Sequence, residues 1–211
     1  MPVKFCGFTQ TSDIQVAAQL GVDALGLVFY APSPRAVTVE QAQILVARVP
    51  AFMSVVALVV NMPRAELTAL ADDVAFDIIQ FHGDESPDEC QQLAKAVNKR
   101  WIKALRINAD NDTSDSIRSQ IEAYAAAGAS SILLDAYQAD KYGGTGARFD
   151  WDLIPHHAAL PIILAGGLDA DNVAATLDLP IYGVDVSGGI ESAKGKKDTD
   201  KMRAFMQAVG K

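Results

Sequence analysis

The sequence predicts an α/β protein that folds as a single (β/α)8 barrel over residues 1–211. Short runs of β-branched and apolar residues recur at intervals of about 20 to 30 residues, and each run precedes a stretch in which Ala, Leu and Val have helical spacing. Eight such pairs can be counted along the chain. Strands that alternate with helices form parallel sheets, because the helix supplies the crossover that a parallel neighbour needs.

The first expected strand begins almost at the amino terminus, where Val3 and Phe5 alternate with Lys4 and Cys6. In order, the expected strands are 3–7, 24–29, 54–61, 77–83, 101–107, 130–136, 162–166 and 183–187. The helices that follow them are expected at 12–20, 40–48, 64–73, 87–97, 115–127, 151–157, 170–177 and 199–208. Three side chains are suited to cap helix N-termini, and they are Ser12, Ser86 and Asp198.

Glycine-rich turns favour a closed barrel over an open, doubly wound sheet. An open sheet usually has five or six strands and a glycine-rich turn after the first strand. Here such turns come late, at 143–146, 166–167 and 188–189, after the sixth, seventh and eighth strands. TIM barrels often bind phosphate at the loops that follow strands seven and eight, so this order predicts a TIM barrel with a phosphate site.

Composition limits the classes of protein and of partner. With 211 residues, 50% of them hydrophobic, the chain can bury one large core, and no apolar run approaches the roughly 20 residues that cross a bilayer. A net charge of −8, with 18 Lys and Arg residues scattered along the chain, argues against a nucleic-acid partner. We expect a cytoplasmic protein that binds no membrane. The net charge still allows a small anionic substrate, because a phosphate needs only backbone N–H groups and one or two local cations.

The two cysteines have different expected roles. Neither Cys6 nor Cys90 belongs to a CxxC or Cys/His cluster, so no disulfide framework or metal site is expected. Cys90 has the spacing of an apolar helix face and is expected in the core. Cys6 ends the first strand, where catalytic residues of barrels lie, and Lys4 on the same strand face would favour the thiolate, which accepts protons. The alternative for Cys6 is a packed, inert thiol.

Three further charged residues stand at expected strand ends. Asp135 ends an Ile-Leu-Leu run, where apolar surroundings would raise its pKa and keep a proton available for donation; the alternative is a turn or cap. Asp185 lies within a valine-rich strand and could orient a substrate hydroxyl or pair with Lys4. Arg35 follows the second strand and suits recognition of a carboxylate, unless it is a solvated surface arginine.

The glycine turns after strands seven and eight are the candidate phosphate site. Glycine lets backbone N–H groups approach phosphate oxygens, although turn formation alone also selects it. The residues in these turns are Gly166, Gly167, Ser187, Gly188 and Gly189.

Motifs at the expected strand ends form an ordered series. They are Lys-Phe-Cys-Gly-Phe-Thr at 4–9, Phe-Tyr-Ala-Pro-Ser-Pro-Arg at 29–35, Gln-Phe-His-Gly-Asp-Glu at 80–85, Leu-Leu-Asp at 133–135, Gly-Gly-Thr-Gly at 143–146, Phe-Asp-Trp at 149–151, Leu-Ala-Gly-Gly-Leu at 164–168 and Gly-Val-Asp-Val-Ser at 183–187. In order and spacing, this series resembles the phosphoribosylanthranilate isomerase family along the whole chain. The family commonly has serine at the position of Gly188.

The resemblance implies an Amadori rearrangement of N-(5-phosphoribosyl)anthranilate in tryptophan biosynthesis, without metal or organic cofactor. By this resemblance Cys6 takes a proton from sugar C2, Asp135 protonates the ring oxygen and Arg35 holds the anthranilate carboxylate. The glycine turns at 166–167 and 187–189 hold the phosphate. Three more residues are expected to contact the substrate, and they are Gln80, His82 and Asp185. We expect a monomer or a homodimer.

Two other classes of protein share parts of this pattern. A phosphate-binding barrel such as a pentulose-phosphate epimerase would need several histidine ligands at strand ends, where only His82 is available, and the aminosugar isomerase of histidine biosynthesis would carry aspartate in place of Cys6. A barrel that only senses a phosphometabolite would not need Cys6 and Asp135 together.

Overall fold

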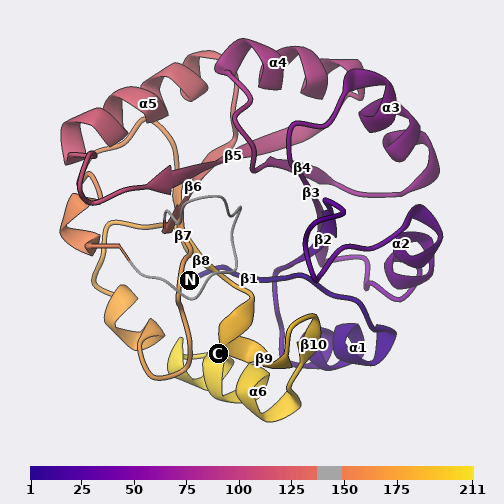
Figure 1. Ribbon diagram of the computed structural model, residues 1–211. Coiled ribbons are helices and arrows are strands. Elements are labelled where there is room, and N and C mark those ends of the chain that lie inside the picture. Colours follow the sequence, from indigo (N-terminus) through magenta and orange to yellow (C-terminus); the bar gives the residue numbers. More distant parts are fainter. Residues whose placement is uncertain (137–148) are drawn as a thin grey trace.

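A computed structural model describes residues 1–136 and 149–211 and shows eight parallel strands closed into a barrel, with the helices outside it (Figure 1). The strands follow one another around the ring in chain order, and β8 pairs with β1 to close it. The expected (β/α)8 architecture is therefore confirmed. The strands are β1 (Val3–Cys6), β2 (Ala24–Phe29), β3 (Ser54–Val59), β4 (Ile78–Phe81), β5 (Arg100–Ile107), β6 (Ser131–Ala136), β7 (Ile162–Leu164) and β8 (Gly183–Val186).

Six α-helices surround the described part of the barrel. They are α1 (Thr11–Gln19), α2 (Val39–Val46), α3 (Arg64–Asp73), α4 (Pro87–Ala96), α5 (Ser114–Ala126) and α6 (Thr199–Ala208). Ser86 and Asp198 cap α4 and α6 as expected, but Ser12 does not cap α1, which begins one residue before it. Within residues 1–136 and 149–211, no helix is long and apolar enough to cross a membrane.

Two expected helices, 151–157 and 170–177, are instead short 3₁₀ turns, η1 (Trp151–Leu153) and η2 (Val173–Thr176). In the first, Pro155 lacks an N–H donor and disfavours helical backbone at the residue before it. In the second, Asp169 Oδ1 accepts hydrogen bonds from the backbone N–H groups two and three residues later. This local turn competes with the start of a helix.

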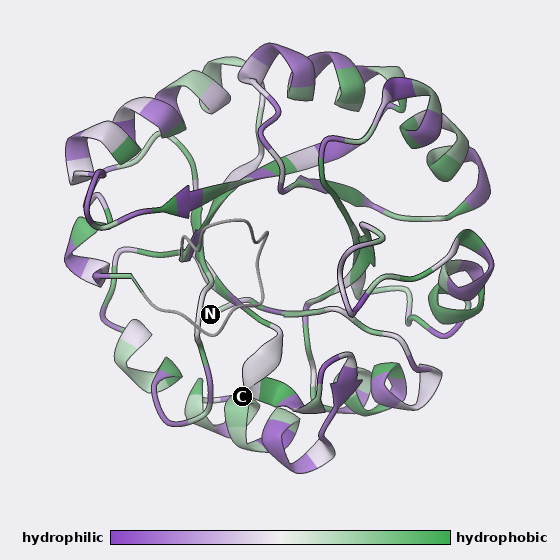
Figure 2. Cartoon of the chain, viewed as in Figure 1, coloured by the Kyte–Doolittle hydropathy of each residue, from purple (hydrophilic) through white to green (hydrophobic). Residues whose placement is uncertain are grey.

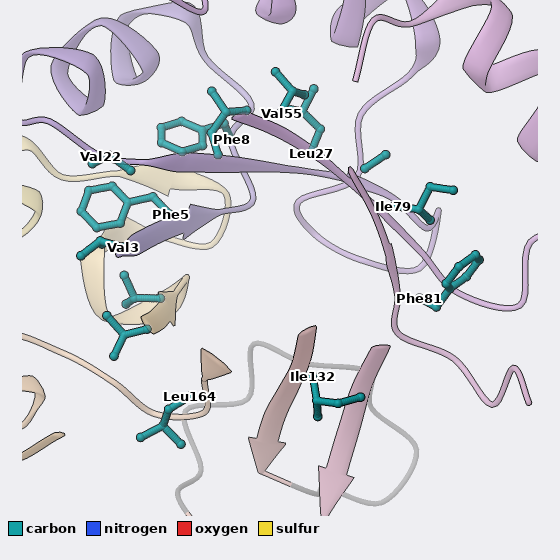
Figure 3. Packing of buried hydrophobic residues seen from close by; sticks show 14 of the residues in the cluster. Val3, Phe5, Phe8, Val22, Leu27, Val55, Ile79, Phe81, Ile132 and Leu164 are labelled. Carbon is teal, nitrogen blue, oxygen red and sulfur yellow. The ribbon is translucent and has the colours of Figure 1, made fainter. Parts of the chain in front are cut away.

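The core has two layers because side chains alternate across each strand. Val3 and Phe5 of β1 point outward into the main hydrophobic cluster (Figure 3). The ring of Phe5 packs edge to face on Phe205 of α6, with centroids 5.8 Å apart. The strand ring is mostly hydrophobic, whereas the helices carry both hydrophobic and hydrophilic residues (Figure 2). Inside the barrel, smaller clusters form the inner layer and include Cys6, Val28, Leu58, Ala104, Leu133 and Ala165.

A small hairpin interrupts the βα repeat after β8. A 3₁₀ turn, η3 (Gly188–Ile190), leads into β9 (Glu191–Ala193), which pairs antiparallel with β10 (Lys196–Lys197) before α6 begins. Figure 1 shows this hairpin between α6 and α1. Its residues contact β1 and the loops after β1 and β2, at the carboxyl ends of the strands.

Candidate active site

One cavity of about 590 Å³ opens at the carboxyl ends of the strands. All of the site residues expected from the sequence line it, and they are Cys6, Arg35, Gln80, His82, Asp135, Gly166, Gly167, Asp185, Ser187, Gly188 and Gly189. The glycine motif at 143–146 lies outside the described residues. Residues from six different strands or the loops after them thus meet in one place, as the barrel topology requires.

Cys6 ends β1 and is nearly buried, with 5% of its surface exposed. Its register partner on β2 is Gly26, and a Cβ at position 26 would lie 2.6 Å from Cys6 Sγ. The glycine therefore leaves the space that the sulfur fills. Two side chains also hold the Cys6 carbonyl, because Lys197 Nζ and Ser187 Oγ donate hydrogen bonds to it at 2.5 and 3.0 Å.

Burial raises the pKa of the Cys6 thiol, and this effect outweighs the opposing effect of nearby cations. Lys4 and Lys197 lower the pKa, whereas Asp185 raises it. Lys4 Nζ lies 2.9 Å from Asp185 Oδ1, so the expected pairing of these two residues is confirmed. The expectation that Lys4 favours the Cys6 thiolate is confirmed in direction, but burial has the larger effect, and the net shift of the Cys6 pKa is upward.

Asp135 ends β6 on the same rim as Cys6, with 4% of its surface exposed. Its Oδ1 accepts a hydrogen bond from the Ala136 N–H at 2.9 Å, and its Oδ2 lies 3.3 Å from His82 Nε2. The latter contact lacks the alignment of a hydrogen bond. The carboxyl group is thus held from the backbone on one side and faces an imidazole on the other.

Gln80 and His82 lie on one face of β4 and its extension, since they are two residues apart. Gln80 Nε2 lies 3.0 Å from His82 Nδ1, and with the amide in this orientation the imidazole proton sits on Nε2, facing Asp135. Both residues are buried. Gln80 Oε1 accepts no hydrogen bond from the described residues, so it is available to a donor group in the cavity.

Arg35 is not a solvated surface residue, because only 7% of it is exposed. Its Nε and Nη2 donate to the two oxygens of Glu191 at 2.8 and 2.7 Å, in a bidentate pair. Burial favours the neutral form of Glu191, but the contacts with Arg35 and Lys197 outweigh it and lower the pKa of Glu191. The Glu191 carboxylate is therefore ionised, and it holds the Arg35 guanidinium in place at the edge of the cavity.

The glycine turns after β7 and β8 also line the cavity. Gly166 and Gly167 have φ of +87° and +61°, a backbone region that favours glycine. A Cβ at Gly189 would lie 1.9 Å from the Leu168 carbonyl oxygen, whereas one at Gly188 would make only an ordinary contact, 3.6 Å from Arg35 Nη2. The close approach of the two turns thus depends on glycine at 189 and not at 188.

Sequence reasoning did not single out Glu191, Lys194 or Lys197. Lys197 is buried, and its Nζ binds Glu191 and two backbone carbonyls. The available signal was Gly195 between two short polar segments, because glycine is common in turns. No group of three or more His, Cys, Asp or Glu side chains in the described ranges could hold a metal ion.

The arrangement is suited to acid–base chemistry on a small substrate with two anionic groups. A thiol and a carboxyl group border one cavity, an arginine stands at its edge, and backbone turns without side chains provide N–H groups for a phosphate.

Comparisons with known proteins agree with this geometry. The family model "N-(5'phosphoribosyl)anthranilate (PRA) isomerase" matches residues 3–208. The chain is 49% identical over 207 residues to the N-(5'-phosphoribosyl)anthranilate isomerase of Pseudomonas putida (strain GB-1), covering 98% of this chain and 96% of the relative. It also resembles the crystal structure of phosphoribosyl anthranilate isomerase from Thermotoga maritima, with a TM-score of 0.87, 30% identity and full coverage of both chains. A third relative, also fully covered in both directions, is a structure of this isomerase in complex with reduced 1-(o-carboxyphenylamino)-1-deoxyribulose 5-phosphate, with a TM-score of 0.81 and 28% identity.

Proposed function

The chain belongs to the N-(5'-phosphoribosyl)anthranilate isomerase family, and we propose that Cys6 and Asp135 are the base and the acid of its reaction. The reaction is the Amadori rearrangement of N-(5'-phosphoribosyl)anthranilate to 1-(2-carboxyphenylamino)-1-deoxyribulose 5-phosphate, in tryptophan biosynthesis. The observation that supports the proposed roles is that the thiol and the carboxyl group border one cavity, with anion-binding groups beside them.

In the first step, Asp135 donates a proton to the ring oxygen of the ribose. The bond between C1 and that oxygen breaks, and the nitrogen lone pair forms a protonated C=N bond at C1. In the second step, the Cys6 thiolate takes the proton from C2, and the C–H electrons form the C1–C2 double bond of an enol. The enol becomes the ketone by moving its hydroxyl proton to C1. At the end of the reaction Asp135 has lost one proton and Cys6 has gained one. Transfer of a proton from the Cys6 thiol to the Asp135 carboxylate returns both groups to their initial protonation states.

Burial of Cys6 affects this proton transfer in two ways. A higher pKa makes the thiolate a stronger base toward a carbon acid, but it also lowers the thiolate fraction at neutral pH. Lys4 limits the second effect because its charge stabilises the thiolate. Lys4 is therefore a positioning residue that acts on Cys6 from within the barrel.

Two kinds of anion-binding group line the cavity, a guanidinium and backbone turns that contain glycine. Arg35 keeps N–H groups of Nη1 that Glu191 does not use and would hold the anthranilate carboxylate. The phosphate would lie on the N–H groups of the turns at 166–167 and 187–189. The remaining polar groups would contact the sugar and the bridging nitrogen, and they are Gln80, His82 and Asp185. Gln80 Oε1 would accept a hydrogen bond from the substrate.

Turnover of freshly made phosphoribosylanthranilate tests the function directly. The substrate has an anthranilate-type fluorescence that the product lacks, so addition of the purified chain should make the signal decay in proportion to protein concentration. A signal that decays no faster than without protein would contradict the assignment. A pentulose phosphate offered to the same protein should not be epimerised.

Three expectations stay predictions. We propose that residues 1–211 form one domain that unfolds in a single transition, that the chain acts as a monomer or a homodimer, and that it works in the cytoplasm. Calorimetry, light scattering of the purified chain and imaging of a fluorescent fusion, respectively, would test them.

A further inference from the structure

We propose that Lys194, at the tip of the β9–β10 hairpin, is a second cation for the carboxylate of the substrate and so contributes to specificity for the anthranilate group. The inference rests on the proposed function, from which it takes its substrate. Lys194 lines the same cavity as Arg35, although its neighbours in sequence belong to a hairpin outside the βα repeat.

The base of the hairpin is fixed by buried charged groups. Lys197 Nζ donates to Glu191 Oε1 at 3.0 Å across the two hairpin strands, and both side chains are almost completely buried. Glu191 in turn binds Arg35, and Lys197 binds the Cys6 carbonyl. The hairpin therefore has one defined position relative to both the proposed base and the proposed carboxylate site.

The tip of the hairpin is fixed as well. Thr9 Oγ1 donates a hydrogen bond to the Gly195 carbonyl at 2.5 Å. Gly195 has a φ of +79°, and a Cβ there would lie 3.0 Å from the Pro34 carbonyl oxygen. Because Pro34 directly precedes Arg35, the tip lies beside the arginine loop. Lys194 is thus placed beside the arginine that is proposed to hold the carboxylate.

Near Arg35, most of the positive charge is already paired with Glu191, so a second cation would strengthen the binding of a carboxylate. Among the described residues that line the cavity, the cations are Arg35 and Lys194. The charge of Arg35 is offset by its bidentate pair with Glu191, and Lys197 is enclosed behind that pair with none of its side chain exposed. Lys194 is exposed, and no ion pair joins it to the described part of the chain. Its charge is therefore available to a bound carboxylate.

The test compares two substrates that differ only in the carboxylate, N-(5-phosphoribosyl)anthranilate and N-(5-phosphoribosyl)aniline, with product measured by chromatography. For Lys194→Ala, kcat/KM on the anthranilate substrate should fall about 5-fold, the size of a partly exposed ion pair, through KM and not kcat. On the aniline substrate the loss should stay below about 2-fold by the same reasoning. Lys194→Arg should restore the value for the anthranilate substrate.

Lys196→Ala is the matched control, because Lys196 is an exposed lysine of the same hairpin that does not line the cavity. Lys196→Ala should leave kcat/KM unchanged for both substrates. Equal losses of Lys194→Ala on both substrates would assign the lysine to the sugar or phosphate and overturn the proposal, as would no loss on either. Failure of the proposed function would show separately, as absent turnover of both substrates by the unmodified chain.

Discussion

Gly26 lies opposite Cys6 in the barrel wall, and a Cβ on Gly26 would lie 2.6 Å from the cysteine sulfur and 3.2 Å from the Cys6 Cα. The sulfur therefore occupies the place that a side chain on β2 would take. Position 26 is thus as much a part of the site as the residues that point into the cavity.

Gly26→Ala should displace the thiol, because the added methyl group meets both the sulfur and the Cys6 backbone. We expect kcat to fall at least about 10-fold and the free energy of unfolding to fall by about 1–3 kcal/mol, as for an overpacked core. Steady-state kinetics and urea unfolding measure the two effects. A destabilised variant with unchanged kcat would show that the sulfur position does not matter.

The pH dependence of kcat/KM should report the Cys6 pKa of the free protein. The base acts as thiolate, so activity should rise as pH rises through this pKa, which burial places above its usual range. Lys4 lowers the pKa and Asp185 raises it. The rising limb should therefore move to higher pH in Lys4→Gln and to lower pH in Asp185→Asn. Shifts of the same sign in both variants would contradict this account of Cys6.

His82→Leu should reduce kcat by a larger factor than it raises KM, because the imidazole faces Asp135 Oδ2 at 3.3 Å and orients the proposed acid in addition to contacting the substrate. We expect a loss of about 10-fold to 100-fold, at or below the lower end of the 10²–10⁴-fold range for general acid–base catalysis, because the acid itself remains. His82→Gln, which keeps a donor near the carboxyl group, should recover part of the activity. A loss confined to KM would instead indicate that His82 only binds substrate.

Gly188 and Gly189 should differ sharply in their tolerance of a side chain. Gly188→Ser adds a Cβ in ordinary contact distance and should fold normally, with KM changed by less than about 3-fold, since the Gly188 N–H remains. Gly189→Ala would push against the Leu168 carbonyl and should lower the melting temperature by several degrees, as expected for about 1–3 kcal/mol of strain. Equal melting temperatures would contradict the close approach of the two turns.

The strand pattern and the site were largely predictable from sequence because both depend on local signals. Apolar runs mark each strand, and Cys6 and Asp135 stand at strand ends, where topology alone brings them to one rim. Helix predictions failed where a local competitor was present, Pro155 after η1 and the Asp169 turn before η2.

Long-range pairs were not predictable in the same way. Glu191 lies 156 residues from Arg35, and nothing in their separate surroundings indicates a bidentate pair. The net direction of the Cys6 pKa also could not be predicted, because it depends on how completely the folded barrel removes water from the thiol. From the sequence only the effect of Lys4 could be inferred, and Lys4 lowers the Cys6 pKa, whereas burial raises it.

Loss of anthranilate-type fluorescence tests the central claim most directly, with freshly made phosphoribosylanthranilate and four proteins side by side. The unmodified chain and Cys90→Ala, which changes the other, core-packed cysteine, should both consume the substrate. Cys6→Ser and Asp135→Asn should retain less than about 1% of the activity, as expected when a general acid or base worth 10²–10⁴-fold is removed. Full activity in either of these two variants would contradict the proposed base and acid.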